Sequence, residues 1–221
     1  MVGILSHSAE WSLAGYPSRQ GVVLWAAIFA LVLLWSALNP TDYLTWGLEV
    51  FPAVAGAAIL FFTRNRFALT RLVYGLILVH CVILLVGGHY TYAEVPLFEM
   101  LKEPMGWSRN NYDKVGHLAQ GFVPAMIARE ILLRLSPVER GGWLNLFVVS
   151  ICLAISALYE LIEWWVALLS EQAAEAFLGT QGYVWDTQSD MGWALAGAVL
   201  ALLVLGRLHD RELGLRGFHK E

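Results

Sequence analysis

The chain has 221 residues, of which 58% are hydrophobic and only 14% are charged, and its formal net charge is −4. Its mean hydropathy is +0.59. This composition is typical of a polytopic membrane protein and excludes an ordinary soluble domain. The sequence has no basic run of the kind that nucleic-acid binding requires. We therefore expect membrane lipid around the protein and no nucleic-acid partner, while no oligomeric state follows from these numbers.

Six apolar segments are long enough to cross a bilayer, which takes about 20 helical residues. They cover residues 21–38, 44–62, 70–88, 114–134, 143–169 and 188–206. We predict an all-α fold, a six-helix transmembrane bundle that forms a single domain over residues 1–221. Two longer connections, 89–112 and 170–187, are expected to serve a site, because long loops in compact domains are often functional.

The basic residues predict how the bundle sits in the membrane. Eleven of the fourteen Lys and Arg residues fall on the side that carries both ends of the chain. Only Lys102, Arg109 and Lys114 fall on the other side. Because short cytoplasmic segments carry an excess of Lys and Arg, both termini are expected in the cytoplasm and the two long connections outside it.

Six ionisable side chains lie in or at the ends of three predicted spans. They are Asp113 and His117, Glu160 and Glu163, and Asp186 and Asp190. Spacings of three or four residues put each pair on one face of its helix. In the predicted orientation all six lie toward the outer side. A charge at the centre of a membrane helix costs about 2.5–3.5 kcal/mol, so these faces should meet around a polar cavity that opens outward. Gln120 lies near the same face.

A bound divalent cation would compensate this cluster, because five carboxylates and an imidazole in a confined space cannot all be charged unaided. A His with several carboxylates suits Zn²⁺, Mn²⁺ or Fe²⁺, whereas an oxygen-only subset suits Mg²⁺ or Ca²⁺. The candidate ligands are Asp113, His117, Glu160, Glu163, Asp186 and Asp190. A metal there would activate a water molecule against an ester, amide or phosphate. Glu163 is the candidate general base, and His117 is the second candidate catalytic residue.

Two other interpretations stay open. The cluster could belong to a proton- or ion-coupled transporter, since carboxylates and His also form proton relays in membranes. Against this, the sequence shows no internal repeat and no paired Gly/Pro interruptions of the kind found in broken-helix transporters. Alternatively, the charged residues only hold the helices together through hydrogen bonds and pairs with Lys114. Six ionisable groups are many for that purpose.

Several other polar residues receive individual predictions. His89 is either a seventh ligand or an interfacial residue, and His80 is expected to be a hydrogen-bonded residue of the core. Glu49 either lines the cavity or extends toward the membrane surface. Glu130 is expected in an exposed ion pair with neighbouring arginines, and His209 in a solvated tail.

Small residues within the spans are predicted to serve packing. Gly192, Gly197 and Gly206 in the last span are expected to allow close approach of another helix. Cys81 and Cys152 both lie in apolar segments and are predicted to be buried packing residues, neither a disulfide nor a metal pair.

Four segments of the chain resemble the YjdF family of bacterial inner-membrane proteins. They are HYTYAEVP (89–96), DKVGHLAQGF (113–122), YELIEW (159–164) and WDTQSDMGWALAGA (185–198). The resemblance covers nearly the whole chain. It implies a six-span protein of the inner membrane, and the family has no assigned biochemical activity.

A more distant resemblance, over residues 113–205, is to the VanZ-like family. The matching residues are Asp113, Lys114, His117, Glu160, Asp190 and Gly197. The chain departs from that family at Glu163, where the family tends to Gln, and at Ala194, where it has Asn. The resemblance implies a role at the cell envelope. The combined hypothesis is a metal-dependent hydrolase or transferase that acts on a lipid-linked or envelope substrate at the outer leaflet.

Overall fold

A computed structural model describes residues 15–169 and 184–215. Within these ranges the chain forms seven helices and no strand. The six long ones are α1 (Arg19–Ser36), α2 (Tyr43–Thr63), α3 (Arg71–His89), α5 (Tyr112–Leu135), α6 (Gly142–Leu169) and α8 (Asp186–Glu212). The short helix α4 (Pro96–Lys102) lies inside the connection predicted at 89–112. The predicted all-α bundle is confirmed, with α4 as an addition. Most of the other predicted connection, residues 170–183, lies outside the described residues.

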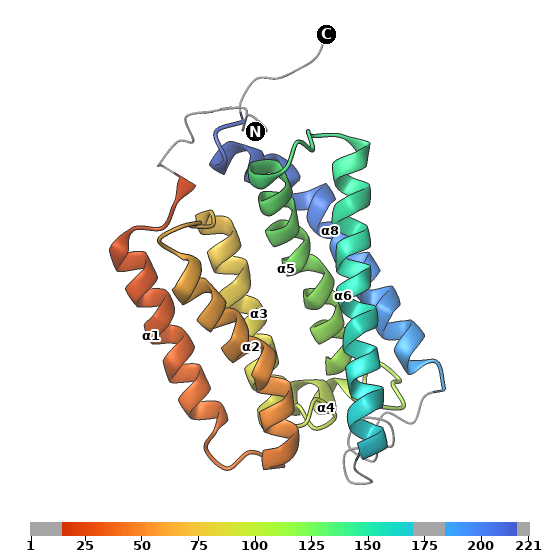
Figure 1. Cartoon of the computed structure of the whole chain (residues 1–221). Coiled ribbons are helices and arrows are strands. Elements are labelled where there is room, and N and C mark those ends of the chain that lie inside the picture. The colour runs from red at the N-terminus through yellow and green to blue at the C-terminus, as the bar shows by residue number, and fades with distance from the viewer. Residues whose placement is uncertain (1–14, 170–183, 216–221) are drawn as a thin grey trace.

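The long helices form two groups that meet along α3 and α5 (Figure 1). One group holds α1, α2 and α3, and the other holds α5, α6 and α8, while α4 lies at one end of the bundle. At the opposite end, Gly15 lies directly against the backbone of Glu212. The amide of Leu72 also donates a hydrogen bond of 2.8 Å to Glu212 Oε2 there. The first and last described residues therefore lie at the same end, as an even number of long antiparallel helices requires.

Helix α5 differs from the other long helices in its polarity. Within the described residues, five helices are long and apolar enough to cross a membrane, and α5 is not among them. It carries Asp113 and His117 near one end, and Arg129, Glu130 and Arg134 near the other. The structure accommodates these side chains by packing α5 against α3, α6 and α8. Neighbouring helices therefore cover the polar groups that lipid could not solvate.

Two glycines let the backbones of α5 and α8 touch. A Cβ atom at Gly121 would collide with the backbone of Ala194, and one at Gly197 would collide with the backbone of Leu118. Small residues at a helix crossing permit this closeness, which gives the van der Waals contact that drives association of helices in membranes. The expectation for Gly197 is thus correct. For Gly192 and Gly206 it is wrong, because a Cβ at either position would meet open space.

A second polar network closes the end of the bundle opposite α4. Glu130 and His209 are both fully buried. Glu130 accepts hydrogen bonds from the amide and hydroxyl of Thr70, at 3.0 and 2.8 Å, and from Arg134 at 2.7 Å. Arg129 donates to His209 Nδ1 at 3.0 Å, so His209 donates from Nε2 to Glu130 at 3.1 Å. Since a guanidinium only donates, the imidazole is held as the neutral tautomer with its proton on Nε2.

The predicted ion pair of Glu130 with a neighbouring arginine is confirmed, since Arg134 lies 2.7 Å from it. Its predicted exposure and the solvated tail predicted for His209 are wrong, because both residues are fully buried. The reason is that α8 continues to Glu212, six residues beyond the predicted end of the last span at 206. The added turns lie against α5, where Arg129 also binds Asp210 at 2.6 Å. Cys81 and Cys152 are buried and free, as predicted for packing residues.

The contact between α5 and α8 generates a first prediction. Gly121→Ala or Gly197→Ala is expected to lower the free energy of unfolding by about 1–3 kcal/mol, because the added methyl group forces two backbones apart. Thermal melting of the purified protein in detergent measures the effect. Gly192→Ala is the matched control on α8, and its melting temperature should stay equal or rise, because alanine favours a helix by up to about 1 kcal/mol over glycine. Equal melting temperatures for all three variants would contradict the packing role.

The buried network generates a second prediction. His209→Ala removes a partner from both Arg129 and Glu130, and a buried charged group that loses its partner costs several kcal/mol, here roughly 3 kcal/mol. We expect a large fall in melting temperature. Arg207→Ala, an exposed residue two positions away on α8, should shift stability by no more than about 0.5 kcal/mol. A His209→Ala protein as stable as Arg207→Ala would show that the network contributes little.

Candidate functional site

A cavity of about 200 Å³ lies inside the bundle toward the end that carries α4. Its wall is formed by α2, α3, α5, α6 and α8, together with Thr91 and Tyr92 in the turn that follows α3. The predicted cavity lay between the fourth, fifth and sixth spans alone. The additional wall from α2 and α3 brings in residues that the sequence pattern did not connect with the site.

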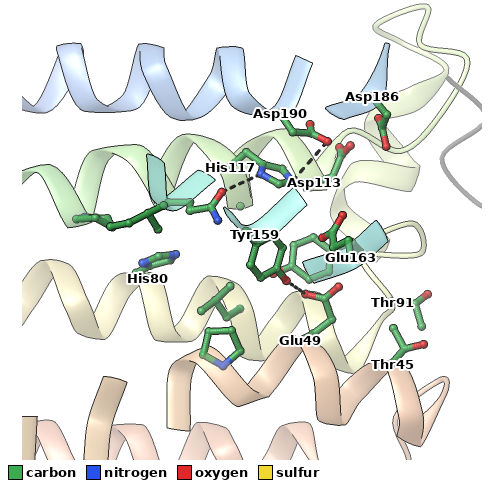
Figure 2. A pocket seen from close by; sticks show the side chains of 17 residues that line it. Thr45, Glu49, His80, Thr91, Asp113, His117, Tyr159, Glu163, Asp186 and Asp190 are labelled. Carbon is green, nitrogen blue, oxygen red and sulfur yellow. Dashed lines mark hydrogen bonds and ion pairs between the residues drawn. The ribbon is translucent and has the colours of Figure 1, made fainter. Parts of the chain in front are cut away.

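The six predicted site residues gather at this cavity. Asp113, His117, Glu163, Asp186 and Asp190 line it. Glu160 is not one of the lining residues but lies beside His117, with Oε1 3.9 Å from His117 Nδ1 and 8% of the residue exposed. Figure 2 shows Asp113, His117, Asp186 and Asp190 along one side of the cavity, with Glu49 facing them across the space. The charged faces of α5, α6 and α8 therefore converge as the helical spacings predict.

His117 is oriented by Gln120, one turn further along α5. The two side chains are joined by a hydrogen bond of 3.0 Å between His117 Nδ1 and Gln120 Oε1. An amide oxygen only accepts, so Nδ1 carries the proton and Nε2 of a neutral ring keeps its lone pair. That Nε2 lies 3.6 Å from Asp190 Oδ2. Two electron-rich atoms thus face each other, which is the tautomer and orientation that a metal-binding His adopts.

Two buried carboxylate oxygens near His117 have no hydrogen-bond partner among the described residues. They are Glu160 Oε1 and Asp190 Oδ1. Only 4% of Asp190 is exposed. Leaving such oxygens unpaired is costly, because a buried polar group retains its full desolvation penalty. One ligand atom from each of His117, Glu160 and Asp190 lies within 4.8 Å of the others, a geometry that could hold a metal ion.

Arg109 supplies a positive charge that the sequence argument missed. Its Nη2 lies 2.9 Å from Asp113 Oδ2 and 2.9 Å from Asp186 Oδ1, so one guanidinium bridges α5 and α8 at the cavity. Lys114 was the expected partner, but the bond that it makes to Asp113 Oδ1 comes from its backbone amide, at 2.8 Å. The signal in the sequence was the four-residue spacing between Arg109 and Asp113, which places opposite charges one turn apart.

The opposite side of the cavity holds a carboxyl group among phenols. Glu49 of α2 is 8% exposed, accepts a hydrogen bond of 3.3 Å from the hydroxyl of Tyr159, and lies close to the hydroxyl of Tyr92. Tyr92 adopts a φ of +54°, and its ring fills the space left by Gly87 and Gly116. Of the two predictions for Glu49, the cavity-lining one is confirmed. Neither tyrosine was singled out, because their motifs carry no spacing that points to Glu49.

The prediction for His80 is wrong, whereas one of the two alternatives for His89 is supported. His80 lines the cavity and its buried Nε2 has no hydrogen-bond partner among the described residues, so the prediction of a hydrogen-bonded core residue is wrong. His89 pairs through Nδ1 with the carbonyl oxygen of Ser36, at 3.0 Å, and its ring packs on Trp35 and Tyr90. The structure therefore favours the interfacial alternative for His89 over the seventh ligand.

Taken together, long apolar helices around a cavity lined by ionisable side chains define an all-helical, multi-pass membrane protein. The chain belongs to the family described as "Predicted membrane protein (DUF2238)", whose model matches residues 21–211. It is 49% identical over 188 residues to the "Inner membrane protein YjdF" of Escherichia coli (strain K12), which covers 85% of this chain and 90% of that protein. No solved structure matches the chain. The resemblance to the YjdF family is thus confirmed, and the one to the VanZ-like family stays a prediction.

Proposed function

We propose that the protein binds a divalent cation on His117, Glu160 and Asp190 and acts as a metal-dependent hydrolase or transferase on a lipid-linked or envelope substrate. The observation that carries the proposal is the convergence of three ligand atoms from α5, α6 and α8 within 4.8 Å of one another. Two of the three residues also have a buried oxygen without a hydrogen-bond partner in the part of the chain that the structure describes. A cation would bind the lone pair of His117 Nε2 together with one oxygen from each of Glu160 and Asp190, and would compensate their negative charge.

The ligand types narrow the choice of ion. One imidazole with two carboxylates suits Zn²⁺, Mn²⁺ or Fe²⁺ better than Mg²⁺. Of the other predicted ligands, Asp113 and Asp186 already pair with Arg109, so they are not ligands of this first ion. An ion at this position supplies a polarised water or substrate oxygen. Glu163 lines the same cavity one turn of α6 beyond Glu160 and is the proposed general base.

The surroundings of the cavity favour a lipid-linked substrate. Helix α4 lies at the same end of the bundle and exposes Leu97, Met100 and Leu101, followed by Met105. An exposed apolar face on a short helix at the end of a membrane bundle suits the interface between headgroups and acyl chains. Such a helix would hold the cavity at the depth where lipid headgroups lie.

We also propose that the protein lies in the bacterial inner membrane with both termini in the cytoplasm and the cavity open to the outside. The location is supported by the name of the relative, an inner membrane protein. The orientation is supported by the eleven Lys and Arg residues on the side of the chain ends, because positive residues concentrate in the cytoplasm.

Reporter fusions test this orientation. A fluorescent protein that folds only in the cytoplasm should be active when fused after residue 221, and alkaline phosphatase, which needs the periplasm, should be inactive there. The opposite result is expected for a phosphatase inserted after Glu103, an exposed residue that follows α4. Reversed activities at both positions would refute the orientation.

Metal binding is tested by thermal melting and by mass spectrometry of gently purified protein. Mn²⁺ or Zn²⁺ should raise the melting temperature of the wild type. At a concentration a hundredfold above the dissociation constant, the bound ion adds about 2.7 kcal/mol to the free energy of unfolding. Glu160→Gln and Asp190→Asn should lose both this response and the bound metal, because each amide removes a negative ligand. Glu103→Gln is the matched control and should respond like the wild type. A folded wild type without any metal response would remove the basis of the proposal.

Proton- or ion-coupled transport is the second candidate, and a specific observation favours it. Pro52 and Pro124 lie inside α2 and α5 and line the cavity. A proline has no N–H, so the carbonyl groups of Leu48 and Gln120 lose their helical donors. Freed carbonyls in membrane helices are used for ion coordination in transporters.

The same protein preparations separate the two candidates. Turnover of an envelope lipid extract that is lost in Glu163→Gln supports the enzyme. Ion or proton flux in proteoliposomes that is lost in Glu163→Gln, without lipid turnover, supports the transporter. If the variants change only the yield and the melting temperature of the protein, the charged residues have a structural role and neither candidate function is supported.

A further inference from the structure

The carboxylate of Asp190 lies between two groups of polar side chains, and the proposed ion involves only one of them. Its Oδ2 points to His117 Nε2 at 3.6 Å, while its Oδ1 is buried and has no hydrogen-bond partner among the described residues. The proposed ion on His117, Glu160 and Asp190 accounts for one of these oxygens. The other is free to serve a second neighbour.

The second neighbour is the pair formed by Asp113 and Asp186. One ligand atom from each of Asp113, Asp186 and Asp190 lies within 4.8 Å of the others, so the chain has two three-residue groups of metal-binding geometry that share Asp190. A single guanidinium, that of Arg109, lies against this second group, at 2.9 Å from both Asp113 and Asp186. The position therefore already holds positive charge. Three carboxylates exceed the compensation that Arg109 and the neighbouring Lys114 provide together.

We propose that Asp113, Asp186 and Asp190 form a second divalent-cation position, at which the Arg109 guanidinium and a metal ion are alternative occupants. The inference rests on the proposed function, because Asp190 serves both positions. The second position offers only oxygen ligands, which Mg²⁺, Mn²⁺ and Ca²⁺ accept. Mn²⁺ also suits the mixed ligands of the first position, so it is the probe that can fill both.

The side chain of Arg109 can move away from Asp113 and Asp186 without disrupting a helix. It lies in the non-helical segment between α4 and the start of α5 at Tyr112. The next residue, Asn110, is anchored by a hydrogen bond of 3.0 Å from its side chain to the carbonyl oxygen of Val95. The segment thus keeps its attachment to the start of α4 when the Arg109 side chain turns away.

A pair of ions that share a carboxylate suits the hydrolysis of a phosphate ester, and the exposed apolar residues of α4 suit an ester that belongs to a lipid. Two divalent ions about 3.5–4 Å apart hold the attacking and leaving oxygens of such an ester. In the hydrolysis, the oxygen of water bonds to phosphorus and the bond from phosphorus to the lipid alcohol breaks. The water gives up a proton, through Glu163, and the alcohol gains one.

The test is a titration of the purified full-length protein with Mn²⁺, followed by electron paramagnetic resonance and by metal mass spectrometry. In the wild type a second Mn²⁺ must displace Arg109. In Arg109→Ala the second Mn²⁺ should bind at least tenfold more tightly, and the spectrum should change from that of isolated ions to that of a spin-coupled pair. Adding Asp186→Asn to Arg109→Ala should return the protein to one Mn²⁺. Lys102→Ala removes another positive charge from the same end of the bundle and should behave like the wild type.

The outcomes separate this inference from the proposed function. An Arg109→Ala protein that binds one Mn²⁺ through His117, with no gain at the second position, overturns the second position and leaves the first intact. A wild type and an Arg109→Ala protein that bind no Mn²⁺ overturn both. An Arg109→Ala/His117→Ala protein that still binds one Mn²⁺, and loses it when Asp186→Asn is added, supports the second position independently of the first. If Arg109→Ala does not fold, Arg109→Gln removes the charge while retaining a hydrogen-bond donor and is read in the same way.

Discussion

The arrangement of this protein depends on one constraint, which is that a helix with charged residues near both ends has to cross the bundle without facing lipid. That helix is α5, which packs against three of the other long helices, α3, α6 and α8. The close backbone contact at Gly121 and Gly197 brings α8 against it, and α3 and α6 cover other faces. At one end the charges are neutralised by a closed hydrogen-bonded network around Glu130 and His209. At the other end they surround a cavity, and the compensation is incomplete.

The difference between these two ends is the main argument for a functional site. Around Glu130 the donors and acceptors match, which is how a purely structural polar cluster should look. Around Asp190 and Glu160 two buried oxygens have no partner within the described residues, and His117 presents its lone pair to a carboxylate. In membrane proteins, ionisable groups of this kind occur mainly where a ligand or an ion binds or where a proton is transferred. The same helix thus carries a polar cluster with complete hydrogen bonding at one end. At its other end, the polar cluster includes buried oxygens that have no partner within the described residues.

Much of this could be predicted from the sequence, because hydropathy and helical spacing are local properties. The six long helices and the convergence of Asp113, His117, Glu160, Glu163, Asp186 and Asp190 follow from them. What failed depends on contacts between distant segments. His209 lay beyond the hydropathic segment, so only the true length of α8 shows that it is buried. The contacts of Arg109 and Glu49 depend on how the helices are rotated relative to one another, and the surroundings of His80 depend on where the cavity lies. The spacing of residues within one helix contains neither kind of information.

The turn after α3 has a consequence for how this family can vary. The ring of Tyr92 lies where side chains at positions 87 and 116 would otherwise stand, and its hydroxyl reaches the carboxyl group of Glu49. Any larger residue at Gly87 or Gly116 would expel the ring from between α3 and α5 and leave Glu49 with one phenol instead of two. These four positions are therefore expected to change together among relatives. A relative that lacks the tyrosine is free to fill both glycines, whereas a relative that keeps the tyrosine must keep them empty.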